Sequence, residues 1–418
     1  MNILFLTIAY KTGRNIYSDL MHEFQEQGHD VWVVCQTERS EHRHTNLSQE
    51  YGINILRVKT WNLTGNVSFI EKGLTIVSIE YLFKKAIAKY LSNIKFDLVL
   101  YSTPPITFGR VVEYVRNRDG ATTYLLLKDI FPQGAVDLGA ISDKSYIYKY
   151  FRRKEEQLYR VSDHIGCMSE ANIRYVLAHN DIPQDKVELN PNSIKPLPVA
   201  KKDKHYADAI RTKYGIPCNT VVFAYGGNLG LPQGLEFLVE VCKKIKARSD
   251  VFLLIVGDGG RYDYLAGDLR VIDAPNIKLL KKLPKDDYDR LISVCDVGLI
   301  FLNPKFTLPN FPSRLTSYME VGLPVLAATD TSTDLKDVLK EADCGLWAKS
   351  GDMDTFLRHV DFLVAYPDER LAMGKRGRKY LEEHYTVDKS YEIIMSHFVK
   401  GEYQKSAAVA RGDERCVS

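Results

Sequence analysis

The stretch that most constrains the fold is Val221–Ile245, which reads VVFAYGGNLGLPQGLEFLVEVCKKI. Its first residues, Val221–Tyr225, are apolar and rich in β-branched and aromatic side chains, which predicts a buried strand. Glycines then mark a turn, and from Leu235 onward apolar residues recur with the helical period. Such a unit places free backbone N–H groups and the positive end of a helix dipole at one point, which suits a phosphate. The turn matches neither a P-loop nor G-x-G-x-x-G, so a glycine-rich turn without a ligand is the alternative.

The length and composition bound the class of protein. The 418 residues suffice for two domains of ordinary size, and the 45% hydrophobic and 26% charged content is typical of a soluble globular protein. The net charge of +3 is too small to indicate nucleic-acid binding. The 7 cysteines are odd in number and scattered, and most fall in predicted strands or helices, which predicts that most are buried free thiols in a reducing compartment. No long apolar run is present, and the opening MNILFLT has no basic leader, so we expect a cytoplasmic protein.

Both halves of the chain alternate strands with helices, which predicts parallel sheets covered by helices on both faces. In the first half the predicted strands are Asn2–Thr7, Asp30–Cys35, Ile53–Val58, Asp97–Tyr101, Ala121–Leu127 and His164–Cys167. In the second half they are Val221–Tyr225, Val251–Val256, Ile277–Leu280, Val297–Phe301 and Pro324–Ala328.

The proline-containing segment Asn190–Lys204 shows no periodicity and predicts a domain boundary. We therefore expect an α/β protein of two doubly wound, Rossmann-like domains that face each other across a cleft. The expected divisions are a first domain at 1–190, a linker at 191–205, a second domain at 206–386, a helix at 387–404 that packs back on the first domain, and a polar tail at 405–418.

Ligands of such sheets collect at the carboxyl ends of the strands, and several loops there carry candidate residues. Gly13 and Arg14 precede the first predicted helix, and Asp129 follows a buried strand in the loop KDIFP. Asp129 is alternatively a turn or capping carboxylate. Pro312 opens a predicted helix that places Ser313 and Arg314 at its positive end, although a capped helix with a surface arginine is also consistent.

Two predicted helices, Gly73–Leu91 and Ser145–Arg160, mix aromatic with basic residues. This composition suits the edge of an anionic bilayer, where aromatic rings and cations both settle. An ordinary surface helix with solvated lysines is the alternative.

The motifs YGGNLGLPQG, VGDGG, PNFPSRLTSYMEVGLPVLA and KDIFP, with GHDVWVV early and NPNSIKP at the linker, are similar in order and spacing to GT-B glycosyltransferases of family 4. These are retaining enzymes that use nucleotide sugars, and the likeness covers about residues 1–400. It is nearest to bacterial enzymes that build O-antigen, capsule or exopolysaccharide. The resemblance implies a UDP-linked donor, a lipid-linked saccharide acceptor, no metal and no cofactor, and work at the inner face of the cell membrane.

On this basis we expect Asp129 and Arg314 to be catalytic. The expected donor-binding residues are Gly13, Arg14, Gly227, Asn228, Gly230, Gln233, Gly257, Asp258, Gly259, Arg261, Ser313 and Ser317.

The chain departs from the family pattern at positions that matter for the donor. Asn228 and Gln233 stand where the family has an arginine and a lysine that hold the diphosphate, and Pro309 and Ser317 stand at its two glutamates. Glu320 lies three residues beyond Ser317, about 300° around the helix, and is not a simple substitute.

With the usual pair absent, the cation that stabilises the leaving group must come from elsewhere. Arg314 is the first candidate, and Arg261 and Arg14 are weaker ones. Two other functions stay open. The departures also fit an inactive binding or scaffold protein of the same fold, and nucleotide-sugar 2-epimerases share the architecture.

Overall fold

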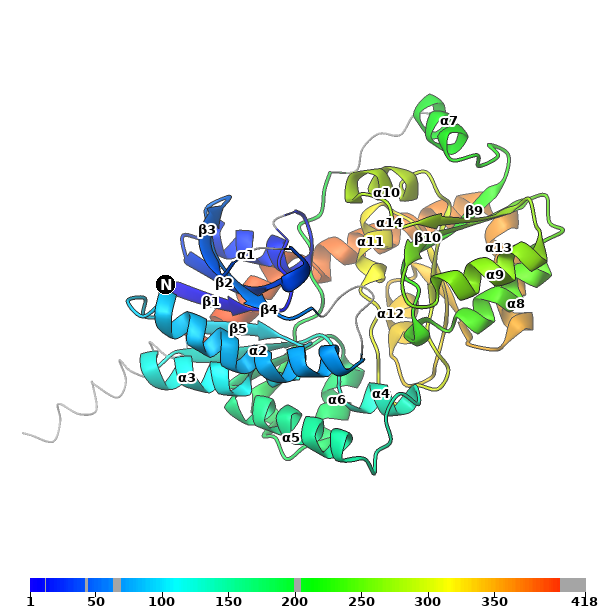
Figure 1. The fold of residues 1–418 in the computed structure, drawn as a ribbon. Helices are drawn as coiled ribbons and strands as arrows, with labels where there is room; N and C mark the ends of the chain where they lie inside the picture. Colours follow the sequence, from blue (N-terminus) through cyan, green and yellow to red (C-terminus); the bar gives the residue numbers. More distant parts are fainter. Residues whose placement is uncertain (12, 42–43, 63–68, 199–203, 399–418) are drawn as a thin grey trace, which may run out of the picture.

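The computed structural model describes residues 1–11, 13–41, 44–62, 69–198 and 204–398, and it consists of two α/β domains side by side (Figure 1). Within these residues, the first domain has an eight-stranded sheet of order β3-β4-β2-β1-β5-β6-β7-β8. The second has a six-stranded sheet of order β11-β10-β9-β12-β13-β14. The predicted tail at 405–418 and the last part of the predicted helix, 399–404, lie outside the described residues.

Every neighbouring pair of strands is parallel except the hairpin β3–β4. The first sheet contains β1 Asn2–Leu6, β2 Asp30–Glu38, β3 Asn46–Glu50, β4 Ile53–Thr60, β5 Leu98–Ser102, β6 Thr122–Leu127, β7 His164–Cys167 and β8 Val187–Leu189. The second contains β9 Val221–Asn228, β10 Val251–Asp258, β11 Ile277–Lys281, β12 Val297–Phe301, β13 Val325–Thr329 and β14 Gly345–Lys349. The two-domain architecture predicted from strand and helix alternation is thereby confirmed.

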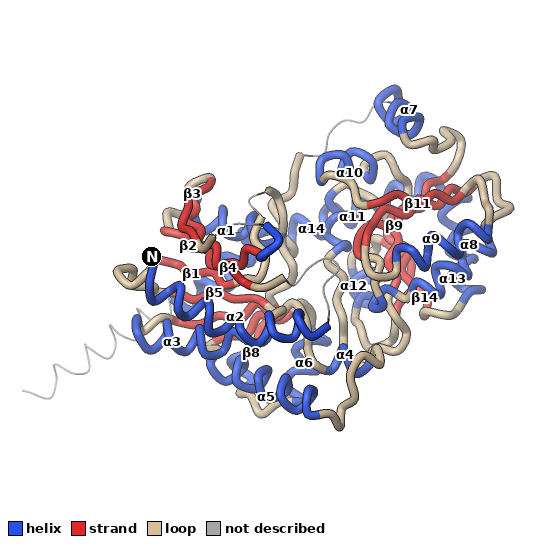
Figure 2. Tube along the Cα trace, in the orientation of Figure 1, coloured by secondary structure: helices blue, strands red, loops and turns tan. Residues whose placement is uncertain are grey.

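Helices cover both faces of each sheet (Figure 2), so the apolar strands are buried on both sides. The first domain has α1 Ile16–Glu26, α2 Phe69–Tyr90, α3 Gly109–Asp119, α4 Gln133–Asp137, α5 Tyr146–Val161 and α6 Glu170–His179. The second has α7 Lys204–Lys213, α8 Leu235–Ile245, α9 Tyr262–Ile272, α10 Lys285–Ile292, α11 Arg314–Glu320, α12 Leu335–Glu341, α13 Met353–Ala365 and α14 Pro367–His384. Single 3₁₀ turns lie at η1 Arg39–Glu41, η2 Ile106–Phe108, η3 Gln184–Lys186 and η4 Leu231–Gln233.

Each sheet has one point where the strand order reverses, between β1 and β5 in the first domain and between β9 and β12 in the second. At such a point the loops leave adjacent strands in opposite directions and open a crevice at the carboxyl ends. The loops after these four strands meet between the domains, and they position the site described below.

The glycine turn differs from its prediction in one respect. The strand was expected to end at Tyr225, whereas β9 continues to Asn228 and pairs Gly226–Asn228 with Val256–Asp258 of β10. A Cβ on Gly257 would lie 2.1 Å from the Gly227 carbonyl oxygen, so glycine here allows the two strands to stay paired to their ends.

The chain crosses between the domains twice. The first crossing follows β8, and the second returns at Tyr385–Val387, where Ile194 forms a parallel bridge with Thr386. Residues 387–398 are helical, and Val387 and Ile394 pack in the first-domain core with Phe5 and Phe24.

Candidate functional site

Two adjoining cavities lie between the domains at the strand ends. The larger, of about 980 Å³, is here called the glycine-turn cavity; Gly226–Asn228 and Gly257–Gly260 form one side and Arg14 lies on the other. The smaller, of about 600 Å³, is called the Asp129 cavity and lies deeper against the loops after β5 and β6. Both cavities include Gly226–Asn228, Ser313 and Arg314, which therefore form their common wall.

The common wall is closely packed backbone with one guanidinium laid over it. Gly227 has φ +131, a conformation open to glycine and strained for other residues. A Cβ there would lie 3.4 Å from Nη2 of Arg314, and a Cβ on Gly259 would lie 2.6 Å from the Leu229 carbonyl oxygen. These glycines let a ligand approach the backbone directly.

Arg314 is held in place by neighbours that do not neutralise it. Its guanidinium carbon lies 4.4 Å from the centre of the Tyr225 ring, and Nη2 donates to the side-chain oxygen of Gln233. Its Nη1 is buried and has no hydrogen-bond partner among the described residues. Arg314 lines both cavities and has no carboxylate partner among the described residues, so its positive charge favours an anionic ligand there.

The other two predicted cations are already engaged. Arg14 forms an ion pair with Glu320 across the domains and also donates to the Lys195 carbonyl oxygen. Arg261 donates to Glu236 at 2.8 Å, and its guanidinium carbon lies 4.3 Å from the Tyr264 ring centre. Arg261 lines neither cavity, so the structure does not place its side chain at the site.

The remaining predicted donor residues divide between those at the cavities and those outside them. Those that line a cavity are Gly227, Asn228, Gln233, Gly257, Asp258, Gly259, Ser313 and Ser317. Gly13 and Gly230 line neither. The Gly13 carbonyl oxygen instead accepts from Asn15 and Ser18 at the start of α1, and is thus part of a helix cap.

Two expectations about α11 need correction. The helix was expected to open at Pro312, but it begins at Arg314, and the Ser313 side chain makes no capping hydrogen bond. Glu320 was set aside because it lies about 300° around the helix from Ser317, yet that rotation equals about 60° in the other direction. Glu320 does line the glycine-turn cavity beside Ser317, where Arg14 holds its carboxylate.

Sequence reasoning also missed two lysines of the glycine-turn cavity. Lys282 follows β11 and Lys285 is the first residue of α10, and both line this cavity. They follow the carboxyl end of a predicted strand, so the rule that singled out the other loops would have found them.

Asp129 lies where it was expected, in the wall of the Asp129 cavity after β6. The hydroxyl of Thr103 accepts the Lys128 N–H at 3.0 Å and the Asp129 N–H at 3.1 Å, so the loop after β5 fixes the loop after β6. The carboxylate opens into the cavity, where the surrounding protein restricts its hydration and raises its pKa above the ordinary value.

Lys128 and Asn192 are further residues of this cavity that the sequence did not reveal. Burial lowers the pKa of Lys128 to about 7, and its Nζ lies 3.4 Å from the Asn190 carbonyl oxygen. The Asn192 side-chain oxygen is buried and has no partner among the described residues. The Asp129 cavity thus offers an acid, a base and an unpaired acceptor to a polar ligand.

Neither a metal site nor a membrane span is found in the part of the chain that the structure describes. No group of three His, Cys, Asp or Glu side chains there is arranged to hold a metal ion. No described helix is both long enough and apolar enough to cross a membrane.

Comparison with known families assigns both halves of the chain. Residues 207–380 match the family "Glycosyl transferases group 1", and residues 15–196 match "Glycosyltransferase Family 4". The two matches together span most of the chain and identify both domains as glycosyltransferase domains.

Individual relatives agree with this assignment. The chain is 23% identical over 322 residues to the "Probable glycosyltransferase WbjE" of Pseudomonas aeruginosa, which covers 76% of this chain and 77% of that protein. It is 27% identical over 187 residues to WcaI of Escherichia coli, a protein named for colanic acid biosynthesis, with 44% and 42% covered. Among solved structures, Anabaena Alr3699/HepE in complex with UDP superposes with a TM-score of 0.69 at 15% identity, covering 96% of this chain and all of that one. The fold is therefore GT-B.

Proposed function

We propose that this glycosyltransferase moves a sugar from a UDP-linked donor to a lipid-linked saccharide acceptor, with retention of the anomeric configuration, in the biosynthesis of a bacterial surface polysaccharide. Three findings support the parts of this proposal. Both domains match glycosyltransferase families. A structural neighbour binds UDP, and one relative is named for colanic acid biosynthesis.

The observation that carries the proposal is the position of Arg314, which has no carboxylate partner among the described residues, at the wall common to both cavities. A diphosphate placed there meets the bare backbone at Gly227 and the planar fork of Arg314, which can bind two phosphate oxygens. The nucleoside then extends into the glycine-turn cavity, and the sugar extends into the Asp129 cavity. Arg314 takes the role of the Arg and Lys that this chain replaces with Asn228 and Gln233.

The reaction breaks the bond between the anomeric carbon and the β-phosphate oxygen, and the electron pair of that bond goes to the phosphate. Arg314 and the backbone N–H groups stabilise the growing negative charge, which is the largest contribution expected from the protein. The acceptor hydroxyl bonds to the anomeric carbon on the face that the phosphate leaves, and its proton passes to a phosphate oxygen. Asp129 faces the acceptor hydroxyl and the cationic sugar.

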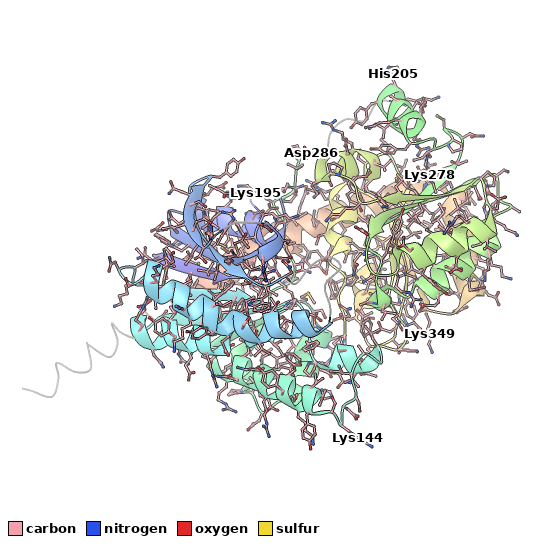
Figure 3. All side chains as sticks on the ribbon, viewed as in Figure 1. Lys144, Lys195, His205, Lys278, Asp286 and Lys349 are labelled. Carbon is pink, nitrogen blue, oxygen red and sulfur yellow. The ribbon has the colours of Figure 1, made fainter. Side chains whose placement is uncertain are left out.

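The acceptor's lipid is inferred from an aromatic path that leads out of the Asp129 cavity. Phe131 lines the cavity, and its ring centre lies 5.1 Å from that of Phe151 in α5. At the start of α5, Tyr146 is 90% exposed and Ile147 is 47% exposed. Lys144 projects from the loop before α5 (Figure 3).

The neighbouring helix α2 extends this surface. Lys154 of α5 and Glu80 of α2 form an ion pair at 2.7 Å, and Tyr81 is 65% exposed. If this surface binds a membrane, the protein floats with anionic liposomes and does not float with neutral ones. High salt should release it, because the screening length falls from about 8 Å at physiological ionic strength to about 3 Å at 1 M salt. Equal flotation with both kinds of liposome, or none with either, would return α2 and α5 to ordinary surface helices.

One assay tests the function. The protein is incubated with radiolabelled UDP-sugars and GDP-sugars, each with and without a lipid-diphosphate-sugar acceptor. Acceptor-dependent transfer supports the proposal, and proton NMR of the new linkage decides between retention and inversion. Isomerisation of the donor would indicate an epimerase, and donor binding without turnover would indicate an inactive scaffold.

A further inference from the structure

A third cavity, of about 570 Å³, lies behind the crossing of the two domains and is here called the hinge cavity. The start of α6 lines it from the first domain, α12 and the end of α14 line it from the second, and the returning helix closes it. It shares only Met168 and Phe311 with the Asp129 cavity and no residue with the glycine-turn cavity. The proposed transfer reaction makes no use of it.

The lining of the hinge cavity is acidic and aromatic. Its carboxylates outnumber its cations, with Glu170, Asp334, Asp337, Glu341 and Glu383 against Arg174 and Lys389. Tyr380 and Tyr385 contribute phenol rings between these charges. Carboxylates beside aromatic faces favour a cation that also has apolar surface.

Asp334 shows that this acidic lining is more than a solvated surface. Its side chain is only 8% exposed. One carboxylate oxygen accepts the N–H of Ala171 at 2.8 Å, while the other is buried and has no partner among the described residues. Leaving a buried carboxylate oxygen unpaired is costly, and a donor supplied by a ligand would remove that cost.

The chemistry of the ligand follows from how the carboxylates are spaced. No three acidic, histidine or cysteine side chains in the described part of the chain converge as a metal ion requires. Several separate carboxylates along an apolar and aromatic lining instead match several ammonium groups joined by methylene chains.

We propose that the hinge cavity binds a linear aliphatic polyamine, with one ammonium on the unpaired oxygen of Asp334 and others on the surrounding carboxylates. Each ammonium donates charge-assisted hydrogen bonds, and the methylenes contact the tyrosine rings.

Binding there would stabilise the present arrangement of the domains. Asp334 of the second domain accepts the Ala171 N–H at the start of α6 in the first, and the Ile194 N–H donates to the carbonyl oxygen of Tyr385, which lines the cavity. A ligand that contacts both sides favours the arrangement that brings those sides together.

Calorimetric titration of the full chain with spermidine at physiological ionic strength tests the proposal. We expect saturable binding that weakens at least about tenfold in Asp334→Asn, since a charged hydrogen bond is lost. The double variant Asp337→Asn/Glu341→Gln should weaken binding similarly, and it leaves the hydrogen bond between Asp334 and Ala171 in place. Glu113→Gln, on the exposed face of α3, removes one carboxylate elsewhere and should bind as the parent does.

Thermal unfolding without spermidine separates binding from folding. Asp334→Asn keeps an oxygen that can accept from Ala171, so its melting temperature should stay close to that of the parent. Absence of saturable heat would overturn the proposal. Equal weakening in Glu113→Gln, or binding of Mg²⁺ in place of spermidine, would overturn it as well.

Discussion

The two sides of the cleft build their polarity in different ways. On the second-domain side, the paired strands end in Gly226–Asn228 and Gly257–Asp258. Much of the polar surface there is backbone, with the side chains of Asn228 and Asp258 beside it and Arg314 packed against Gly227. On the first-domain side, the polar groups of the Asp129 cavity are side chains, among them Lys128, Asp129 and Asn192. Backbone dipoles do not titrate, whereas these two ionisable side chains have pKa values shifted by their surroundings.

This contrast suggests that the second-domain side binds the anion and that the first-domain side carries the pH-dependent chemistry. An anion held by this backbone and by Arg314 would bind with little dependence on pH, because neither group changes charge near neutrality. A wall that contains a lysine of pKa about 7 changes its charge over the range in which enzymes work. The effects of substitutions on the two sides should therefore differ in their pH dependence as well as in their magnitude.

Loss of Arg314 from the common wall should have the largest effect on transfer. We expect Arg314→Ala to lower transfer by about two to three orders of magnitude, the usual range for removing one donor at a developing charge. Initial rates with a saturating donor and UDP affinity by calorimetry measure this, and the loss should be the same at each pH. Arg314→Lys should recover only part of the rate, because a point charge does not reproduce the fork.

Gln233→Lys provides the matched addition on the same wall. It restores the residue that the family places there. The variant should keep its activity and bind UDP more tightly. Near-normal turnover and normal UDP affinity in Arg314→Ala would remove the basis for a relocated cation, and Lys282 and Lys285 would then be the next candidates.

The sequence predicted the second-domain side of the cleft better than the first-domain side, for a physical reason. A strand that ends in glycines before an amphipathic helix is a local pattern, and local patterns are visible in the sequence. The pKa of Lys128 depends instead on burial next to Asn190, 62 positions away. Glu320 is turned to the cavity by Arg14, 306 positions away in the other domain.

The fold shows the same division. Apolar strands buried on both faces were predicted with small errors at their ends. The strands β3, β8 and β14 were not predicted. β3, with sequence NLSQE, is a polar edge strand without a buried residue, so it lacks the apolar signal on which the other predictions rest.

Gly227→Ala tests whether backbone forms the anion wall. The backbone at this position has φ +131, which strains an alanine, and the added Cβ would lie 3.4 Å from Nη2 of Arg314. We therefore expect the free energy of unfolding to fall by about 1–3 kcal/mol and UDP affinity to fall about tenfold. Gly267→Ala is the control, because a Cβ there, inside α9, meets nothing within 4 Å. It should leave UDP affinity unchanged and slightly stabilise the helix. Equal UDP affinity in both variants would contradict a backbone anion site.

Asp129→Asn should lower transfer less than Arg314→Ala does, and it should raise the stability of the fold. Transfer should fall about three- to tenfold, the value of one hydrogen bond to the acceptor or sugar. The raised pKa means that the folded protein binds the proton more tightly than the unfolded chain does. The wild-type carboxylate is thus unfavourable at neutral pH, and the variant should melt at a higher temperature there. This difference should shrink as pH falls through the raised pKa toward 3.8, and a difference that grew in acid would contradict the assigned shift.

Lys128→Met should have the smallest effect on transfer, and the sign of its effect on stability follows from the same linkage. The ordinary lysine pKa is 10.5, and burial lowers it here to about 7, so between these values the unfolded chain binds a proton that the folded protein has largely released. Wild-type stability should therefore rise with pH from about 7 to 10.5 on account of this residue. Methionine has similar length and no charge, so the variant should be more stable than wild type at pH 7 and lose that advantage by pH 10.5. Thermal unfolding of both proteins across this range measures the difference. A constant difference would mean that Lys128 keeps an ordinary pKa, and the first-domain side of the cleft would then depend on pH as little as the second-domain side does.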